Sequence, residues 1–349
     1  MRNWSENYVD FMHYTVPLTA AVGGDYKFPS QYVGQYGVYE AVHHIYSHSS
    51  RLRQLVSADG TELHASQRYF SKDCESAIQE VRASWRQANG LSDDQSVIFF
   101  APGNELKEAQ FTMESTRKGV KEFLLKYSAP TSLSAKARPL DNFVTVISTH
   151  AGSAGEQYAK DYVREHGWTG KIVWVTNQDS EHLSAMCAAD FGIIYDGQMV
   201  SSAAACHLPT MNLMNMRMHH QFYSDLFNRW WNDMNIIADN NVYPELVGGE
   251  AWFGKIADTL ASWYLNPDTR YLMIRKFEGF IQDGMAKKPI DRSVVKTRDI
   301  TLSDGRTYDV FMDPMTVATR KIWADMQAYE LRGERLHDHT AIKTQMHAM

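Results

Sequence analysis

Residues 193–209 read Ile-Ile-Tyr-Asp-Gly-Gln-Met-Val-Ser-Ser-Ala-Ala-Ala-Cys-His-Leu-Pro. The pattern predicts a buried strand, a tight turn at Gly197 and a helix of small residues that ends at Pro209. Free N–H groups and partial positive charge at such a helix start favour an anion, and a glycine lets a ligand approach the backbone. The same pattern also fits an ordinary strand–helix unit without a ligand, because one glycine turn is a weak signal.

Similar units extend from this stretch in both directions. Apolar runs of strand length alternate with helical segments, which is typical of a parallel sheet covered on both faces and connected by right-handed crossovers. The expected strands are 97–101, 143–148, 172–176, 191–195, 209–213 and, as a sixth, 236–238. We therefore predict a doubly wound, Rossmann-like α/β fold that binds ligands at the carboxyl ends of its strands. The turns at Gly103, Gly152 and Gly197 should all lie at that edge.

Helical segments separate the predicted strands. They are expected over 73–89 and 105–126, then in a segment that follows Gly152 and Gly155 and ends near Gly167, and over 179–188, 216–233, 250–264, 267–283 and 315–331. Asp73 is a suitable N-cap residue for the first of them, and Asp179 or Ser180 for the fourth. Gly90 is a suitable C-terminal stop.

The two ends of the chain depart from this alternation. Residues 1–35 contain a short strand-like segment, 8–18, and are too few to form a domain. Residues 297–311 predict a β-hairpin whose turn contains Asp304-Gly305. A last helix and a polar tail follow, so residues 286–349 are expected to be an addition to the sheet domain.

Composition narrows the class of protein. The chain has 349 residues and is 44% hydrophobic, which is enough for a large core. Its net charge of -6 argues against general binding to nucleic acid. Three cysteines give no disulfide framework, no apolar run has the length of a membrane span, and the N-terminus lacks a signal-peptide pattern, which together indicate a reducing compartment. His43, His44, His48 and His64 do not have the spacing of metal ligands, so neither a metal nor a resident cofactor is predicted.

Several motifs occur in a set order. They are Tyr-Val-Asp-Phe at 8–11, Tyr-Val-Gly-Gln at 32–35, Pro-Gly-Asn-Glu-Leu-Lys-Glu at 102–108, Asp-Gly-Gln-Met-Val-Ser-Ser at 196–202 and Asn-Val-Tyr-Pro-Glu-Leu at 241–246. The last three resemble Pro-Gly-Ser-Arg-x-x-Glu, Ser-Gly-Thr-Ala-Thr-Leu-Glu and Asn…Val-Val-Pro-Glu-Leu of lipid-A-disaccharide synthases, which are glycosyltransferases of the GT-B architecture. The resemblance covers roughly residues 8–285 and concerns the C-terminal half, which binds the donor sugar nucleotide.

The resemblance implies a division of the chain and a ligand. Residues 36–285 would form a nucleotide-sugar-binding domain, and residues 1–35 would be the remnant of its seam with an acceptor domain. A UDP-sugar is the implied ligand. The residues that would contact it are Gly103, Asn104, Gly197, Gln198, Ser201, Ser202, Asn241 and Glu245.

This chain departs from the family pattern at the same motifs. Glu105 replaces an arginine that suits a phosphate, and Asp196 adds a second negative charge near the expected phosphates. Ser202 replaces a glutamate that suits ribose or sugar hydroxyls. The family's acceptor domain, which supplies the base for the acceptor hydroxyl, is almost wholly absent. Loss of positioning and of proton transfer removes most of a transferase's rate.

Three hypotheses follow. The first is a non-catalytic glycosyltransferase-like domain that serves as a structural or interaction subunit of a larger assembly, mitochondrial if the source is eukaryotic and otherwise cytoplasmic. It would bind protein partners and contact nucleic acid only indirectly. The second is an active hexosyltransferase that uses UDP-acyl-glucosamine to make a glycolipid disaccharide, with peripheral membrane contact and a separate acceptor domain. The third is a regulatory nucleotide-binding module without transfer activity.

Overall fold

The computed structural model describes the sheet domain and two small strand pairs. The described residues are 12–14, 30–32, 41, 44–45, 48, 74–128, 142–195, 199–215, 232, 234–235, 241–248, 252–266, 268, 272–273, 298–301 and 307–310. The strands are β1 (Met12–Tyr14), β2 (Ser30–Tyr32), β3 (Ser96–Ala101), β4 (Phe143–Thr149), β5 (Lys171–Thr176), β6 (Phe191–Ile194), β7 (Thr210–Met214), β8 (Glu245–Val247), β9 (Arg298–Thr301) and β10 (Thr307–Val310). The helices are α4 (Cys74–Ala88), α5 (Leu106–Ser128), α6 (Ala154–His166), α7 (Glu181–Ala188), α8 (Met199–Ala205) and α11 (Trp252–Leu265), with a 3₁₀ turn at Gln178–Ser180.

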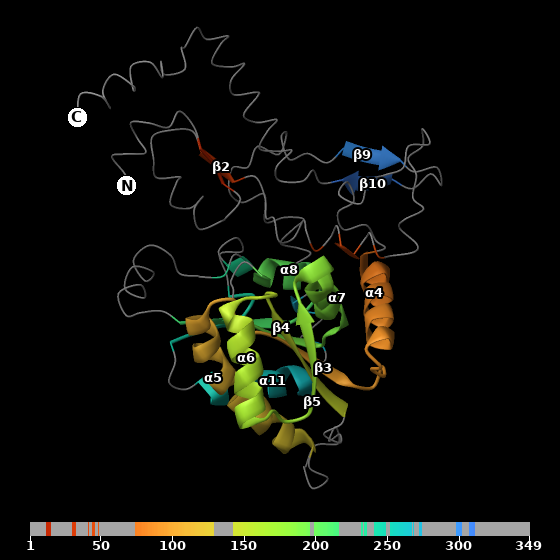
Figure 1. The fold of residues 1–349 in the computed structure, drawn as a ribbon. Helices are drawn as coiled ribbons and strands as arrows, with labels where there is room; N and C mark the ends of the chain where they lie inside the picture. The colour runs from red at the N-terminus through yellow and green to blue at the C-terminus, as the bar shows by residue number, and fades with distance from the viewer. Residues whose placement is uncertain are drawn as a thin grey trace, which may run out of the picture.

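Six parallel strands form the central sheet, in the order β5-β4-β3-β6-β7-β8 (Figure 1). From β3 the chain moves outward through β4 to β5, then returns to β6 on the other side of β3. This is the doubly wound, Rossmann-like order, and it confirms the predicted fold class. Gly103 and Gly152 follow β3 and β4, so these two turns lie at one edge, as expected, whereas Gly197 lies outside the described residues.

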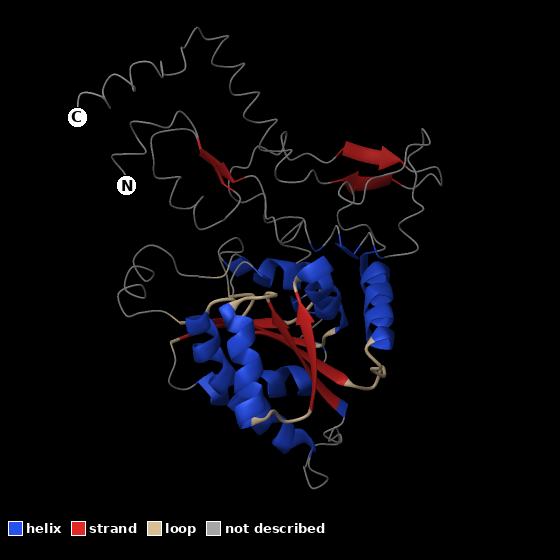
Figure 2. Cartoon of the chain, viewed as in Figure 1, coloured by secondary structure: helices blue, strands red, loops and turns tan. Residues whose placement is uncertain are grey.

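Burial explains why the apolar runs form these strands. Every residue of β3, β4 and β6 is buried. Helices lie on both sides of the sheet (Figure 2), so neither face of the central strands meets water. Helix α5 packs against α6 and α11, while α4 packs against α7. Gly119 permits the close crossing of α5 and α11, since a Cβ there would lie 2.8 Å from the Ile256 side chain and the Phe253 carbonyl.

The helix ends test the predicted caps. Gly90 ends α4 as expected: its φ is +61°, and the N–H of Leu91 donates to the Arg86 carbonyl, as in a Schellman motif. Ser180 occupies the N-cap position of α7, but it has a left-handed φ of 58° and makes no capping hydrogen bond. The prediction of a side-chain cap there is therefore wrong for Ser180, because the preceding 3₁₀ turn sets its backbone, and Asp179 lies within that turn. Asp73 lies outside the described residues.

Other expected elements have mixed outcomes. The hairpin is confirmed as the antiparallel pair β9–β10, although Asp304-Gly305 lies outside the described residues. The segment 236–238, expected as a sixth strand, also lies outside them, and the sixth strand of the sheet is β8. The helices expected over 216–233, 267–283 and 315–331 fall almost entirely outside, as does the polar tail. Within residues 1–35, β1 pairs in parallel with β2.

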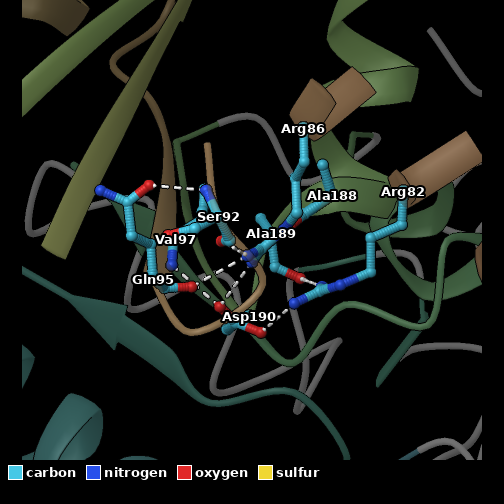
Figure 3. Close-up of polar contacts among 8 residues, drawn as sticks. All are labelled: Arg82, Arg86, Ser92, Gln95, Val97, Ala188, Ala189 and Asp190. Carbon is cyan, nitrogen blue, oxygen red and sulfur yellow. Dashed lines mark hydrogen bonds and ion pairs between the residues drawn. The ribbon is translucent and has the colours of Figure 1, made fainter. Parts of the chain in front are cut away.

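A buried ion cluster at the amino edge of the sheet attaches α4 to β3 and β6 (Figure 3). Arg86 is 1% exposed, and its guanidinium donates to Asp190 Oδ2 at 3.1 Å. It also donates to the carbonyls of Ala188, Ser92 and Gln95 at 2.9–3.1 Å. Burial lowers the pKa of Arg86, while the Asp190 carboxylate opposes that shift. This one side chain therefore satisfies three backbone carbonyls and a carboxylate.

The carboxylate of Asp190 is held from three directions. Arg82 donates to its Oδ1 at 2.7 Å, and the backbone N–H of Val97 donates to its Oδ2 at 2.8 Å. Arg82 also donates to the carbonyl of Ala189 at 3.0 Å. These contacts lie at the end of the strands opposite to the expected ligand site, so their role is structural.

Candidate ligand site at the carboxyl edge of the sheet

Strand register brings the expected site residues to a common level. Ala101 pairs with Ile194, Ile194 with Asn212, and Asn212 with Glu245. The carboxyl ends of β3 and β6 therefore lie level with the first residue of β8. The switch point of this doubly wound sheet lies between the carboxyl ends of β3 and β6, where such folds bind ligands. The structure thus brings Gly103 and Glu245 to one edge, whereas Gly197 and Gln198 lie outside the described residues.

The start of α5 is occupied by a side chain of its own helix. The Glu108 carboxylate accepts hydrogen bonds from the backbone N–H groups of Asn104, at 2.8 Å, and Glu105, at 3.0 Å. Gly103 has a φ of +103°, and a Cβ there would lie 2.5 Å from the Glu108 Cβ. Two N–H groups expected to face a phosphate are therefore already bound to a carboxylate. This role of Glu108 was not identified from the sequence, although a glutamate at the third helical position is a known capping signal.

The start of α6 is satisfied in the same way. The N–H of Gly152 donates to Glu156 Oε2 at 2.7 Å, and the N–H of Glu156 donates to the Ser153 hydroxyl at 3.0 Å. The ion pair with Lys160, followed by the Gly152 hydrogen bond, lowers the pKa of Glu156. Glu156 is therefore ionised at neutral pH and forms a capping box with Ser153.

The two helix starts are in direct contact with each other. The N–H of Gly155 donates to the Asn104 carbonyl at 3.0 Å. A Cβ at Gly155 would lie 2.6 Å from the Gly103 carbonyl oxygen and 2.8 Å from that of Asn104. The absence of a side chain at Gly155 therefore lets the β3–α5 turn rest on the first turn of α6.

A network of asparagines holds Glu245. Its Oε1 accepts hydrogen bonds from the Asn232 N–H at 2.7 Å, the Asn232 side chain at 2.8 Å and the Asn235 side chain at 3.1 Å. The Asn235 side chain accepts from the N–H groups of Val242 and Tyr243, and it donates to Asn241 Oδ1 at 3.4 Å. Burial raises the pKa of the Tyr243 phenol. Asn241 and Glu245 thus belong to a backbone-fixing network whose members Asn232 and Asn235 were not identified from the sequence.

The remaining predicted residues lie in α8, which is buried. Ser201 is fully buried and Ser202 is 5% exposed. Next to α8, the buried side chain of Asn212 donates to the carbonyls of Ile194 and Tyr195, at 2.9 and 3.2 Å. Asn212 therefore fixes the backbone at the end of β6, a role that no sequence motif signalled.

A second polar pair follows β4 and β5. The His150 ring and the Asn177 side chain are hydrogen-bonded, and Asn177 Oδ1 accepts from the Ala151 N–H at 3.3 Å. The pair closes the loops after the two strands against each other. Among the described residues, no group of three or more His, Cys, Asp or Glu side chains could hold a metal. His44 instead contacts the Ser184 hydroxyl at 2.7 Å, and His43 and His64 lie outside the described residues.

Comparisons with known proteins give neighbours of structure alone. No family model matches the chain, and no curated protein matches it. Solved structures that resemble it include the N-terminal domain of trehalose-6-phosphate phosphatase from Candida albicans, at 10% identity and a TM-score of 0.38, covering 74% of this chain and 51% of that one. The wall teichoic acid polymerase TagF matches at 12% identity with a TM-score of 0.40, and the match covers 81% of this chain and 55% of that one. UDP-GlcNAc 2-epimerase from Neisseria meningitidis, solved with UDP-GlcNAc, matches at 13% identity with a TM-score of 0.36, and the match covers 60% of this chain and 52% of that one.

This chain therefore spans about half the length of each of these proteins. None of the three is a lipid-A-disaccharide synthase, so the family suggested by the motifs is not established by them. The Rossmann-like fold stands on the strand order of the sheet itself. In the part of the chain that the structure describes, no helix combines the length and the apolar character needed to cross a membrane.

Proposed function

We propose that this chain is a glycosyltransferase-like domain that has lost catalytic activity and serves as a structural or interaction subunit of a larger assembly. The observation that supports the loss is the exposed Glu105 at the β3–α5 turn, where the family has an arginine. The family resemblance places the donor diphosphate at this turn. The compartment is a reducing one, mitochondrial if the source is eukaryotic and otherwise cytoplasmic.

A diphosphate would have to displace the Glu108 carboxylate from the N–H groups of Asn104 and Glu105, as it would in the family, whose motif carries a glutamate at the same position. Backbone N–H groups and the helix dipole at α5 favour one anion, and Glu108 already supplies it. A nucleotide would meet the neighbouring Glu105, which is exposed, and it would also lose the attraction of the arginine that the family has there. The N–H of Gly152 at the adjacent helix start is likewise bound to Glu156. The edge is thus stable without a ligand and repels an anionic one.

The alternative is an active hexosyltransferase that uses UDP-acyl-glucosamine. The position of Gly103 and Glu245 at the same edge of the sheet favours it, because this edge is where a donor nucleotide would bind. Such an enzyme needs an acceptor domain on a separate chain. The base that activates the acceptor hydroxyl would come from that domain.

Titration calorimetry with UDP tests the proposal directly. We expect a dissociation constant weaker than about 1 mM, equivalent to about 4 kcal/mol of binding free energy. Micromolar binding of UDP, or transfer of acyl-glucosamine from UDP to a lipid acceptor by the purified chain, would contradict the loss of function.

The assembly role is tested by purification from the native source. We expect the chain to co-purify with defined partner proteins. We propose that residues 1–35, as the remnant of a seam with an acceptor domain, and the β9–β10 hairpin make these contacts. Deletion of 1–20 or of 296–312 should release the chain from the complex while circular dichroism still reports a folded domain. A chain that elutes free of partners from native extracts would contradict this role.

A further inference from the structure

The two edges of the central sheet differ in length and in protection. Strand β8 has three residues and is followed by Gly248, which has a φ of +79°. Strand β5 has six residues, and among the described residues β4 alone pairs with it. Short, charged edges resist pairing with another chain, whereas long edges leave a row of N–H and C=O groups to be satisfied.

The composition of β5 makes this edge suited to pairing. Its sequence is Lys-Ile-Val-Trp-Val-Thr, in which the central four residues are apolar and β-branched or aromatic. The central strands β3 and β4 are wholly buried, whereas Ile172, Val173 and Trp174 are each partly exposed. No proline or internal charge interrupts the strand, and Lys171 at its start is its one charged residue.

The strand is also complementary to itself. When two β5 strands lie antiparallel about a two-fold axis, a residue and its counterpart share one face of the sheet. With Val173 opposite its counterpart, Ile172 faces Trp174 of the other copy, and Lys171 faces Val175. Ile172 and Trp174 form an aliphatic–aromatic pair, and Val175 packs on the aliphatic stem of Lys171. No two like charges lie opposite each other in this register.

We propose that β5 is the interface through which two copies of this chain form a two-fold dimer with one continuous sheet. The occupant of the edge is thus a second copy, in antiparallel register centred on Val173. Such an interface is isologous, as in most homodimers. The inference goes beyond the proposed function and does not depend on it, since UDP binding and oligomeric state are measured separately.

The oligomeric state of the full chain is the first test. Light scattering after size exclusion should give twice the chain mass of 39.9 kDa at high protein concentration, falling toward that mass on dilution. The substitution Val173→Lys sets two ammonium groups opposite each other and should leave a monomer at every concentration. Gln110→Lys, at an exposed position on α5, adds the same charge elsewhere and should leave the dimer intact.

Cross-linking tests the register and remains informative if Val173→Lys fails to fold. Directly opposite residues of an antiparallel pair have Cβ atoms about 4.5–5.5 Å apart, so Val173→Cys should form a disulfide dimer under mild oxidation. Thr176→Cys lies roughly 20 Å from its counterpart in this register, from a rise of about 3.3 Å per residue, and should remain monomeric on a denaturing gel. A wild-type chain that is monomeric at all concentrations, or a dimer that survives Val173→Lys, overturns the proposal. Equal cross-linking at both positions overturns the register.

Discussion

Replacement of Arg86 by methionine is expected to destabilise the domain far more than the same change at Arg82. Both residues lie on α4 and both bond to Asp190, but Arg86 is 1% exposed and Arg82 is 15% exposed. Arg86→Met leaves the carbonyls of Ala188, Ser92 and Gln95 without their donor. It also takes one of the two guanidinium partners from the Asp190 carboxylate.

The magnitudes follow from burial. Removing one partner of a buried ion pair costs about 3–5 kcal/mol, because the remaining groups stay desolvated. Arg82→Met removes two hydrogen bonds at a site that water reaches, and at roughly 0.5–1.5 kcal/mol each it should lower the free energy of unfolding by about 1–3 kcal/mol.

Urea denaturation followed by circular dichroism measures the difference as a shift in transition midpoint at constant slope. If Arg86→Met costs no more than Arg82→Met, then the buried cluster is not the anchor of α4. A changed slope would mean that the substitution altered the extent of unfolding, and the comparison would then use thermal midpoints.

Three further predictions concern other sites. Burial lowers the pKa of His182 to about 4, below the value of about 6.5 in an unfolded chain, so the unfolded state takes up the proton first as the pH falls. The contribution of His182 to the free energy of unfolding should therefore be complete above pH 6.5 and decrease by about 3 kcal/mol toward pH 4. His182→Leu should lose much less over that range in paired urea titrations, and equal losses in both proteins would contradict the assignment. Gly155→Ala should lower the free energy of unfolding by about 1–3 kcal/mol, because the new Cβ meets the Gly103 and Asn104 carbonyls. Gly254→Ala has open space at its Cβ and should raise that free energy by about 0.5–1 kcal/mol. Thermal melts in which Gly155→Ala is the more stable variant would refute the contact. Glu108→Ala should lower the free energy of unfolding by about 0.5–2 kcal/mol through loss of the cap. Glu122→Ala, at an exposed position of α5, should change it by no more than about 0.5 kcal/mol. Equal melting temperatures for the two variants would show that the cap contributes nothing.

Periodicity and glycine turns were sufficient to predict most of the sheet. Runs such as 97–101 and 143–148 are apolar without interruption, which is the pattern of strands buried on both faces, and both are strands of the expected type. Strand β8 was not predicted as a strand, because its three residues include Glu245 and the run is too short for a period to appear. Its position depends on register with Asn212 and on the asparagine network, both of which are tertiary.

The positions of the turns were predictable, but the hydrogen bonds at the helix starts were not. The order of strands and turns correctly predicted that Gly103 and Gly152 lie at the carboxyl edge, since the topology follows from alternation of strands and helices. The occupation of the α5 start by Glu108 depends on a side-chain rotamer, which no spacing rule specifies. Asn212 and Asn232 escaped notice because a single buried asparagine leaves no periodic signal in a sequence.

The ion pair between Arg86 and Asp190 has a consequence for how the chain is made. The two residues are 104 positions apart, so α4 leaves the ribosome long before its anchor does. At about 5–20 residues per second, the interval is roughly 5–20 s. During most of that interval the apolar face of α4, with Ala77, Ile78 and Val81, lacks helix α7, against which α4 packs in the folded domain. Synthesis of this domain therefore requires either rapid chaperone binding to the nascent chain or a slow, late docking of its first helix.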